Sequence, residues 1–259
     1  MRIEQSSGSA HAFHHRPLPE LFDPRTDHTV VAIHRVDRPA LVLGSAQRPD
    51  VLDTISAVAA GWEVTGRRSG GGLVVVEPSD SCWIDVVIGR DHPAWQDDVN
   101  EAFGWVGAWW RDALTSLGVA DLDVHRGAST HPTHGRVVCF AAVGPGEVVQ
   151  RVDRNDDRHD DRHDDRHDDG PTDRQSAAKV VGLSQRRTRD IARFQGLYLR
   201  RWDPEPFHRF LLAEAVPEDL DLDQVVAGLD RSDSTHLDRE VSPRPDDLID
   251  AFIAVAPMR

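Results

Sequence analysis

The sequence of 259 residues contains almost no lysine: Lys179 is the only one, beside 29 arginines. The two cations differ in shape, because lysine ends in a compact ammonium on a thin stem whereas arginine ends in a broad planar fork. A chain that uses arginine at every other cationic position retains lysine where the fork would not fit. Lys179 is therefore a candidate functional residue, and the alternative is a surface lysine without a special role.

The chain is also poor in cysteine and has no long apolar run. Two cysteines give no disulfide framework, so each is expected to be a free thiol in a reducing compartment. No apolar stretch approaches the roughly 20 residues that span a bilayer, and no basic segment followed by an apolar run stands at the N-terminus. These features predict a cytoplasmic protein with no membrane partner.

Acidic side chains outnumber basic ones, and the formal net charge is −14. General nucleic-acid binding relies on basic side chains that neutralise phosphates, so this balance argues against a nucleic-acid partner. Much of the negative charge lies in residues 151–175 and 217–250. The remaining body is therefore less acidic than the total indicates.

Composition divides the chain into a body and three less regular segments. Residues 1–26 mix Ser, Gly, His and Pro and are expected to be loosely ordered. The tetrapeptide DDRH occurs three times within residues 156–167, which predicts a disordered insertion at 151–175; we expect no metal site there, because the repeat has no fixed geometry. We expect the catalytic domain at 27–216 and an acidic tail with short helices at 217–259.

Local patterns in the body favour an antiparallel or mixed sheet with helices. β-branched and apolar runs predict strands at 29–34, 40–43, 73–76, 82–88, 122–125, 136–142 and 197–199. Apolar spacings of three and four predict a long helix at 95–117, a short one at 53–60 with Ile55 and Val58 on its apolar side, and a last one at 246–255.

A glycine-rich loop is the first feature that could carry chemistry. Three consecutive glycines follow two arginines in the run Arg67, Arg68, Ser69, Gly70, Gly71 and Gly72. Without Cβ atoms, successive N–H groups can converge on an anionic or carbonyl oxygen. The alternative, a tight hairpin loop, accounts for one or two glycines but not for three beside two arginines. The strand at 40–43 also ends in small residues, from Gly44 to Gln47, where a ligand could approach the backbone.

A thiol and the lysine form the second feature. Cys139 lies at the end of the strand expected at 136–142, and Lys179 follows about fifteen residues later once the insertion is left out. A nearby cation favours a reactive thiolate, although a buried cysteine is often only a small hydrophobic residue. We assign that inert role to Cys82. We expect Lys179 to lie on a buried strand. The strand would lead to a cationic rim formed by Arg186, Arg187, Arg189 and Arg193.

These residues resemble a known family. The run RRSGGG at 67–72 resembles the signature of lipoate-protein ligases and their octanoyltransferase relatives, in the biotin and lipoate ligase superfamily. The segment KVVGLSQR at 179–186, with Gly182, Ser184 and Gln185, resembles the region around that family's invariant lysine. The early G-x-x-Q of Gly44 and Gln47 and the later FQG at 194–196 are also similar, so the resemblance covers about residues 30–200.

The resemblance implies a fold, a ligand and partners. The fold would be an α/β (α+β) domain, with a mixed and largely antiparallel sheet flanked by helices and a tunnel for an eight-carbon acyl chain. Lys179 would contact the acyl carbonyl or the activated carboxyl oxygen, and the glycine loop would close over the ligand. Gly44, Gln47, Gly182, Ser184 and Gln185 would line the binding site. The acceptor would be a lysine on a lipoyl carrier domain, of a glycine-cleavage H-type protein or a 2-oxoacid dehydrogenase E2 component.

Two enzymatic reactions and one non-enzymatic role remain open. The segment from Cys139 to Glu147 resembles the C-F-x₆-E segment of an octanoyltransferase branch. This favours transfer from an octanoyl acyl carrier protein through an acyl-cysteine, with no cofactor. An ATP-dependent lipoate ligase, using ATP and Mg²⁺ with Cys139 as a structural residue, is the alternative. A catalytically silent acyl-binding protein on the same fold is the third.

Overall fold

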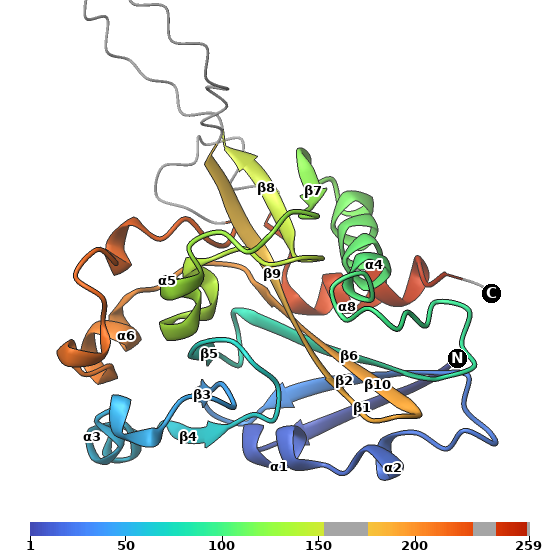
Figure 1. Ribbon diagram of the computed structural model, residues 1–259, viewed down its shortest axis with the longest axis horizontal. Helices are drawn as coiled ribbons and strands as arrows, with labels where there is room; N and C mark the ends of the chain where they lie inside the picture. The colour runs from blue at the N-terminus through green and yellow to red at the C-terminus, as the bar shows by residue number, and fades with distance from the viewer. Residues whose placement is uncertain (153–175, 230–241, 258–259) are drawn as a thin grey trace, which may run out of the picture.

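The computed structural model describes residues 1–152, 176–229 and 242–257 and has the mixed α+β architecture expected from the sequence (Figure 1). The main sheet has seven strands in the order β1-β2-β6-β10-β9-β8-β7. Within it only β1 and β2 are parallel, so the sheet is largely antiparallel as predicted. Its strands are β1 (Arg2–Gly8), β2 (Thr29–Val36), β6 (Ser81–Gly89), β7 (Leu122–Val124), β8 (Val148–Val152), β9 (Ser176–Arg187) and β10 (Ile191–Leu199).

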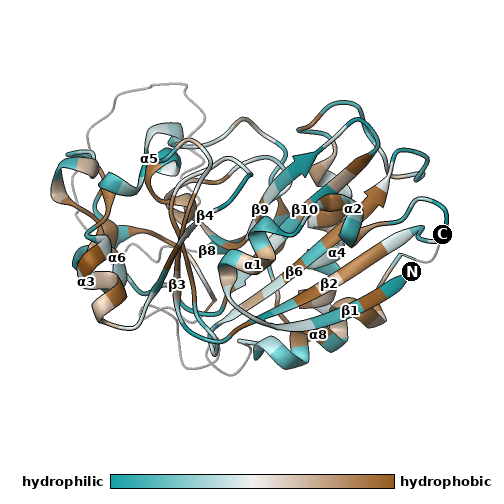
Figure 2. Cartoon of the chain, turned by 90° about the horizontal axis from the view of Figure 1, so that it is seen from below, coloured by the Kyte–Doolittle hydropathy of each residue, from teal (hydrophilic) through white to brown (hydrophobic). Residues whose placement is uncertain are grey.

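A second, smaller sheet carries the glycine loop. It has three strands in the order β4-β3-β5, namely β3 (Ala40–Leu43), β4 (Glu63–Gly66) and β5 (Val74–Val76). β3 and β4 are parallel and β5 is antiparallel to β3. Residues 67–73, which connect β4 to β5, therefore leave this sheet where β3 and β4 both end. In Figure 2, β3 is coloured largely hydrophobic, in agreement with the complete burial of its four residues.

The helices cover both faces of the main sheet. Figure 1 shows α4 (Phe103–Ser116) and α8 (Pro245–Ala254) on one side, with α1 (Ala10–His15) and α2 (Leu18–Leu21) on the other. The others are α3 (Thr54–Ala59), α5 (Pro132–Val137) and α6 (Glu205–Phe210), with 3₁₀ turns at Pro49–Val51, Cys139–Ala141, Ala213–Ala215 and Leu222–Gln224. No helix in these three described ranges is both long and apolar enough to cross a bilayer.

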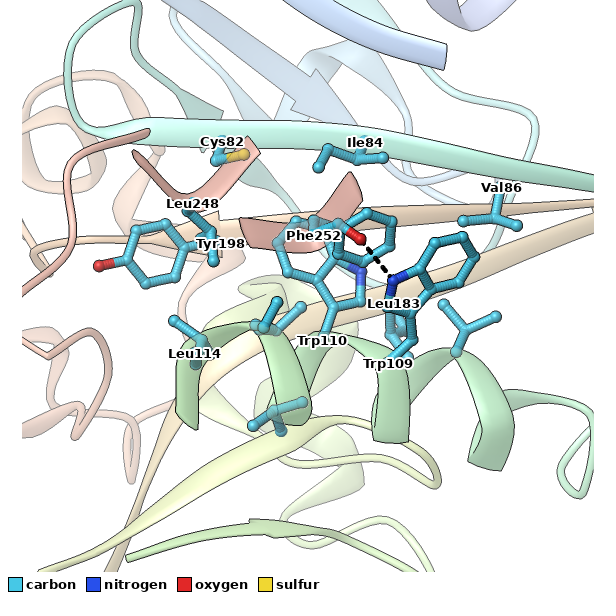
Figure 3. Close-up of a cluster of buried hydrophobic side chains, with 14 of the residues drawn as sticks. Cys82, Ile84, Val86, Trp109, Trp110, Leu114, Leu183, Tyr198, Leu248 and Phe252 are labelled. Atoms are coloured by element: carbon cyan, nitrogen blue, oxygen red, sulfur yellow. Dashed lines mark hydrogen bonds between the residues drawn. The ribbon is translucent and has the colours of Figure 1, made fainter. Parts of the chain in front are cut away.

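The main core lies between the sheet and the pair α4 and α8. Trp109 stacks on Phe252 with ring centroids 4.3 Å apart, and its Nε1 donates a 2.7 Å hydrogen bond to the Phe252 carbonyl (Figure 3). Trp110 is fully buried and packs so closely on β10 that only glycine fits at position 196. The last helix of the acidic tail therefore completes the core of the body. Its predicted position at 246–255 agrees with α8.

Three local expectations are wrong. Residues 1–26 are not loosely ordered: β1 joins the edge of the main sheet and α1 buries Ala10, Phe13 and His14. The long helix begins at Phe103 instead of residue 95. Residues 136–142 form the end of α5 and a 3₁₀ turn instead of a strand, because Pro132 starts a helix and Val138, which follows it, is buried beneath the glycine loop.

Of the other expectations, one is confirmed in part and two are not tested by the described residues. The short helix predicted at 53–60 exists as α3, but its apolar side chains face solvent, since Ile55 is 83% and Val58 is 62% exposed. The predicted insertion at 151–175 lies outside the described residues, except for the end of β8. The domain limits at 27–216 and 217–259 remain predictions.

Candidate functional site

Lys179 lies at the centre of a buried polar cluster. Its ammonium donates to the carbonyl oxygens of Cys139 at 2.8 Å and Ala142 at 3.0 Å, and it forms a 2.7 Å ion pair with Glu147 Oε2. The Cys139 Sγ lies 3.6 Å from the same nitrogen. Three N–H groups thus satisfy three oxygens, and the sulfur lies within reach of the same ammonium. The predicted proximity of Cys139 and Lys179 is confirmed.

The environment keeps this lysine charged. Burial alone would lower the pKa of Lys179, but the Cys139 sulfur and the Glu147 carboxylate outweigh it and hold that pKa above its ordinary value. Glu147 is itself fixed, since its oxygens accept N–H bonds from Gly144 at 2.7 Å and Leu183 at 3.1 Å. The lysine is therefore a fixed cation beside the thiol and is unsuited to act as a base near neutral pH.

An apolar pocket opens beside Cys139. It encloses about 430 Å³ of empty space, including its mouth. Most of its lining is apolar, namely Val42, Val74, Val76, Trp83, Phe140 and Leu197, which come from both sheets and the 3₁₀ turn. Cys139, Arg67, Gly182 and Ser184 also line it, whereas Lys179 lies behind Cys139. The pocket suits a hydrocarbon chain whose reacting end reaches the sulfur.

Polar residues at the pocket are bound to one another. Ser69 donates to Ser184 Oγ at 2.9 Å and lies 3.2 Å from Gln195 Oε1, and the Gln195 amide reaches His14 Nδ1 at 3.1 Å. Burial holds the pKa of His14 well below its usual range, so the imidazole is neutral near pH 7. The chain of hydrogen bonds ties α1, the glycine loop, β9 and β10 together around the pocket.

Arg67 holds the glycine loop from inside. The side chain is only 6% exposed and donates to the carbonyls of Val42, Gly70 and Gly72 at 2.8 to 3.2 Å. Burial lowers the pKa of its guanidinium, and three carbonyl oxygens compensate part of the lost hydration. Although it lines the pocket, its N–H groups are used within the protein.

The glycines of the loop have different surroundings. A methyl group at Gly44 would overlap the Gly71 carbonyl, and one at Gly72 would lie 2.6 Å from the Val137 backbone. Within the described part of the chain, the N–H groups of Gly70, Gly71 and Gly72 donate to no protein acceptor. Gly71 also lies beside the sulfur, since a Cβ there would be 3.9 Å from Cys139 Sγ. The loop therefore offers unpaired donors next to the thiol.

Of the predicted site residues, only Arg67, Cys139, Gly182 and Ser184 line the pocket, and three of the others show where such residues lie instead. Gln185 is opposite Phe194 in the β9–β10 register, so both side chains share the face that packs on α4. Arg68 is exposed at the rim. Gln47 serves the frame: it accepts from the Gly44 N–H and donates to the Val137 carbonyl, each at 3.0 Å, which links the end of β3 to the segment before Cys139.

One arginine of the predicted cationic rim is buried and does not belong to it. Arg193 is 1% exposed and pairs with Asp85, which also accepts from His34 Nε2 at 2.8 Å and Trp83 Nε1 at 2.8 Å. The Asp85 carboxyl is fully buried, yet the Arg193 and His34 charges overcome that burial and lower its pKa. This cluster fixes Trp83 in the wall of the pocket. Periodicity alone did not indicate it, because it joins β2, β6 and β10.

Pocket residues absent from the sequence-based set include His14, Trp83, Phe140 and Leu197. Glu147 was recognised only as the end of the cysteine segment, without its contact to Lys179. A signal for Glu147 exists in the sequence, because it is the only acid in the apolar run 137–149. His14 had no comparable signal, since its burial depends on the docking of α1.

We expect Gly71→Ala to loosen the loop. Gly71 has a φ of +94°, and a methyl group there would lie 2.8 Å from Arg67 Nη2. Strain at such a position costs about 1–3 kcal/mol, which denaturant unfolding would measure. Gly70→Ala is the matched control, because a methyl group there meets nothing within 4 Å. Equal losses in the two variants would contradict this account of the loop.

Comparisons with known proteins agree with the geometry. The family model described as "Lipoyl protein ligase A/B catalytic domain" matches residues 18–256. A bi-partite lipoate protein ligase from Thermoplasma acidophilum, studied with its E2 lipoyl domain, has a similar structure, with a TM-score of 0.59, 15% identity and coverage of 98% of this chain and 82% of that one. A lipoate-protein ligase A bound with ATP is also similar, with a TM-score of 0.59, 14% identity and coverage of 98% of this chain and 84% of that one. A search of curated protein sequences finds no match.

Proposed function

Because the chain belongs to the lipoyl protein ligase A/B catalytic domain family, we propose that it transfers an octanoyl or lipoyl group to a lysine of a lipoyl carrier domain through a thioester on Cys139. The family is enzymatic, and the solved relatives above share the fold. One observation carries the choice of reaction: a charged, buried Lys179 lies 3.6 Å from Cys139 Sγ, and that cysteine lines an apolar pocket.

The lysine supports the thiolate. A positive charge near a thiol favours the ionised, nucleophilic form, and Lys179 stays protonated because its pKa is raised. Glu147 and two backbone carbonyls hold the ammonium in place. In this proposal Lys179 acts on Cys139 from behind the pocket, a different role from the carbonyl contact that the family resemblance implied.

The glycine loop supports the oxyanion. When the Cys139 sulfur attacks an acyl thioester, a new C–S bond forms and the carbonyl oxygen gains a negative charge. The N–H groups of Gly70, Gly71 and Gly72, which donate to no acceptor among the described residues, are candidate donors, and Gly71 lies beside the sulfur. The C–S bond to the donor then breaks, and the carrier leaves as a thiolate that takes up a proton.

The second half of the reaction restores the cysteine. The acceptor lysine, as a neutral amine, attacks the acyl-cysteine; an amide bond forms, the amine loses a proton and the Cys139 thiolate departs. We propose an octanoyl acyl carrier protein as donor and a lipoyl carrier domain as acceptor. The acceptor is supported by the Thermoplasma acidophilum relative, which was studied with its E2 lipoyl domain. This route needs no cofactor.

One observation favours an ATP-dependent ligase as the second candidate. The Nη1 of Arg186 is buried and has no hydrogen-bond partner among the described residues, and Arg68 is exposed at the rim. Burial and the charge of Arg68 lower the pKa of Arg186, which means that the two cations lie near each other. Two close guanidinium groups fit phosphate oxygens, and the relative bound with ATP uses the same fold. Under this reading Cys139 has a structural role.

An intact-mass experiment separates the candidates. The purified full chain is incubated with an octanoyl acyl carrier protein, and we expect a gain of one octanoyl mass that peptide mapping assigns to Cys139. An acceptor lipoyl domain added afterwards should gain the acyl mass as the enzyme loses it. Labelling of the acceptor only with lipoate and ATP would favour the ligase. Binding of octanoate with no transfer under either condition would contradict both candidates.

A further inference from the structure

We propose that Phe140 sets the upper limit on the length of the acyl chain, because its ring separates the acyl pocket from a second hollow of similar size. This inference rests on the proposed function. The second hollow encloses about 420 Å³ of empty space including its opening, against about 430 Å³ for the acyl pocket. Of the described residues that line them, Phe140 is the one common to both.

The second hollow continues the line of the first. Leu197 lines the acyl pocket and Leu199 lines the second hollow, and the two are neighbours on one face of β10. Val74 and Val76 line the first from one face of β5, whereas Val75, on the opposite face of that strand, lines the second, so the second hollow also reaches past the edge of β5. Trp202 and Phe207 form the apolar part of its far wall. The rest of its lining is polar, with Glu77, Asp80, Ser81, Arg201 and Asp203, so a chain that passed Phe140 would pack against the apolar wall formed by Val75, Leu199, Trp202 and Phe207.

The ring is fixed in this position. Phe140 is 3% exposed, and the Lys179 ammonium lies 4.9 Å from its ring centroid. Gly182 faces the ring so closely that a Cβ there would be 3.2 Å from it. Because Cys139 and Phe140 are adjacent in one 3₁₀ turn, the nucleophile and the barrier are placed together. The limit is therefore a rigid wall at a set distance from the sulfur.

Trimming the ring should move that limit. Each further methylene that leaves water adds about fourfold to affinity, so a chain that enters the second hollow is strongly favoured over one that stops short. In Phe140→Ala we expect the ratio of dodecanoyl to octanoyl transfer to rise at least about tenfold. A ratio within one variant cancels any general loss that follows from removing the ring beside Lys179.

The measurement is a competition with equal amounts of octanoyl and dodecanoyl acyl carrier protein, read as the two acyl masses on Cys139. The wild-type chain should take octanoyl and exclude dodecanoyl. Phe207→Ala is the matched control, since it enlarges only the second hollow, and we expect its ratio to stay that of the wild type. Adding Leu199→Phe to Phe140→Ala should refill the hollow and return the preference to octanoyl.

The outcomes test the length limit set by Phe140 separately from the proposed reaction. A wild type that accepts octanoyl, with a Phe140→Ala variant of unchanged ratio, overturns the inference and leaves the proposed function intact. If no thioester forms, the same comparison is made by thermal shift with octanoic and dodecanoic acid, which tests the length limit set by Phe140 without catalysis. If circular dichroism shows that Phe140→Ala does not fold, Phe140→Leu replaces it, and an unchanged ratio there is equally contradictory.

Discussion

Cys139→Ala should abolish acyl transfer. The sulfur is the group that exchanges one acyl bond for another, and loss of a nucleophile lowers turnover by on the order of 10⁴-fold or more. The side chain removed is small and half-buried, so the fold should survive. Octanoyl transfer to a lipoyl domain, followed by mass spectrometry, measures the loss, and the acyl-enzyme mass should disappear with it.

The second cysteine provides a matched control. Cys82 is 1% exposed in the main core, and burial raises the pKa of its thiol, so it should neither ionise nor react. We expect Cys82→Ala to retain transfer and acyl labelling, with only the modest loss of stability that follows removal of a buried sulfur. Cys139→Ser with undiminished transfer would refute the thioester route, because a serine at this site has no thiolate for Lys179 to stabilise.

The residues of the candidate site are easier to recognise in the sequence than the pocket that surrounds them. The glycine loop, Cys139 and Lys179 are each marked by residue type and order along the chain, and leaving out the insertion was enough to predict that the last two are neighbours. Gln185 shows the limit of this approach. It lies one residue from Ser184, and because successive strand residues face opposite sides, only the register with β10 shows that its side chain points away from the pocket.

Arg67 and His14 show two further limits. The motif places Arg67 among residues that bind a ligand, but the fold uses its guanidinium to hold the carbonyls of the glycine loop. Composition cannot distinguish these uses, because both require a buried cation. His14 was missed since residues 1–26 lack a strong periodic pattern, and their order comes from pairing with β2 and from docking on the sheet. Tertiary contacts decided both cases.

Lys179→Met should remove both activity and much of the stability. The substitution leaves the Glu147 carboxylate buried without its cation, and breaking a buried pair in this way costs about 3–5 kcal/mol, which denaturant unfolding would measure. Thiolate support is lost at the same time, so transfer should fall by at least about 10²-fold even in molecules that remain folded.

A second change separates the two losses. In Lys179→Met with Glu147→Gln the buried charge is neutralised, while the new amide oxygen can still accept an N–H bond from Gly144 or Leu183, the two that the carboxylate now holds. We expect most of the stability to return and the transfer activity to remain absent. Recovery of both would mean that the lysine is only a partner for the buried acid.

Lys179→Arg tests why this chain retains a single lysine. The lysine stem passes within 3.3 Å of the position that a Cβ at Gly182 would occupy, and the Phe140 ring lies beside the ammonium. A guanidinium is broader and carries its charge further from the backbone, so it should displace the 3₁₀ turn that holds Cys139 and abolish transfer. Arg193→Lys is the matched control, because it exchanges one buried cation for another at a position outside the pocket. Full activity of Lys179→Arg would show that the position tolerates either cation, and the scarcity of lysine would then carry no information about the site.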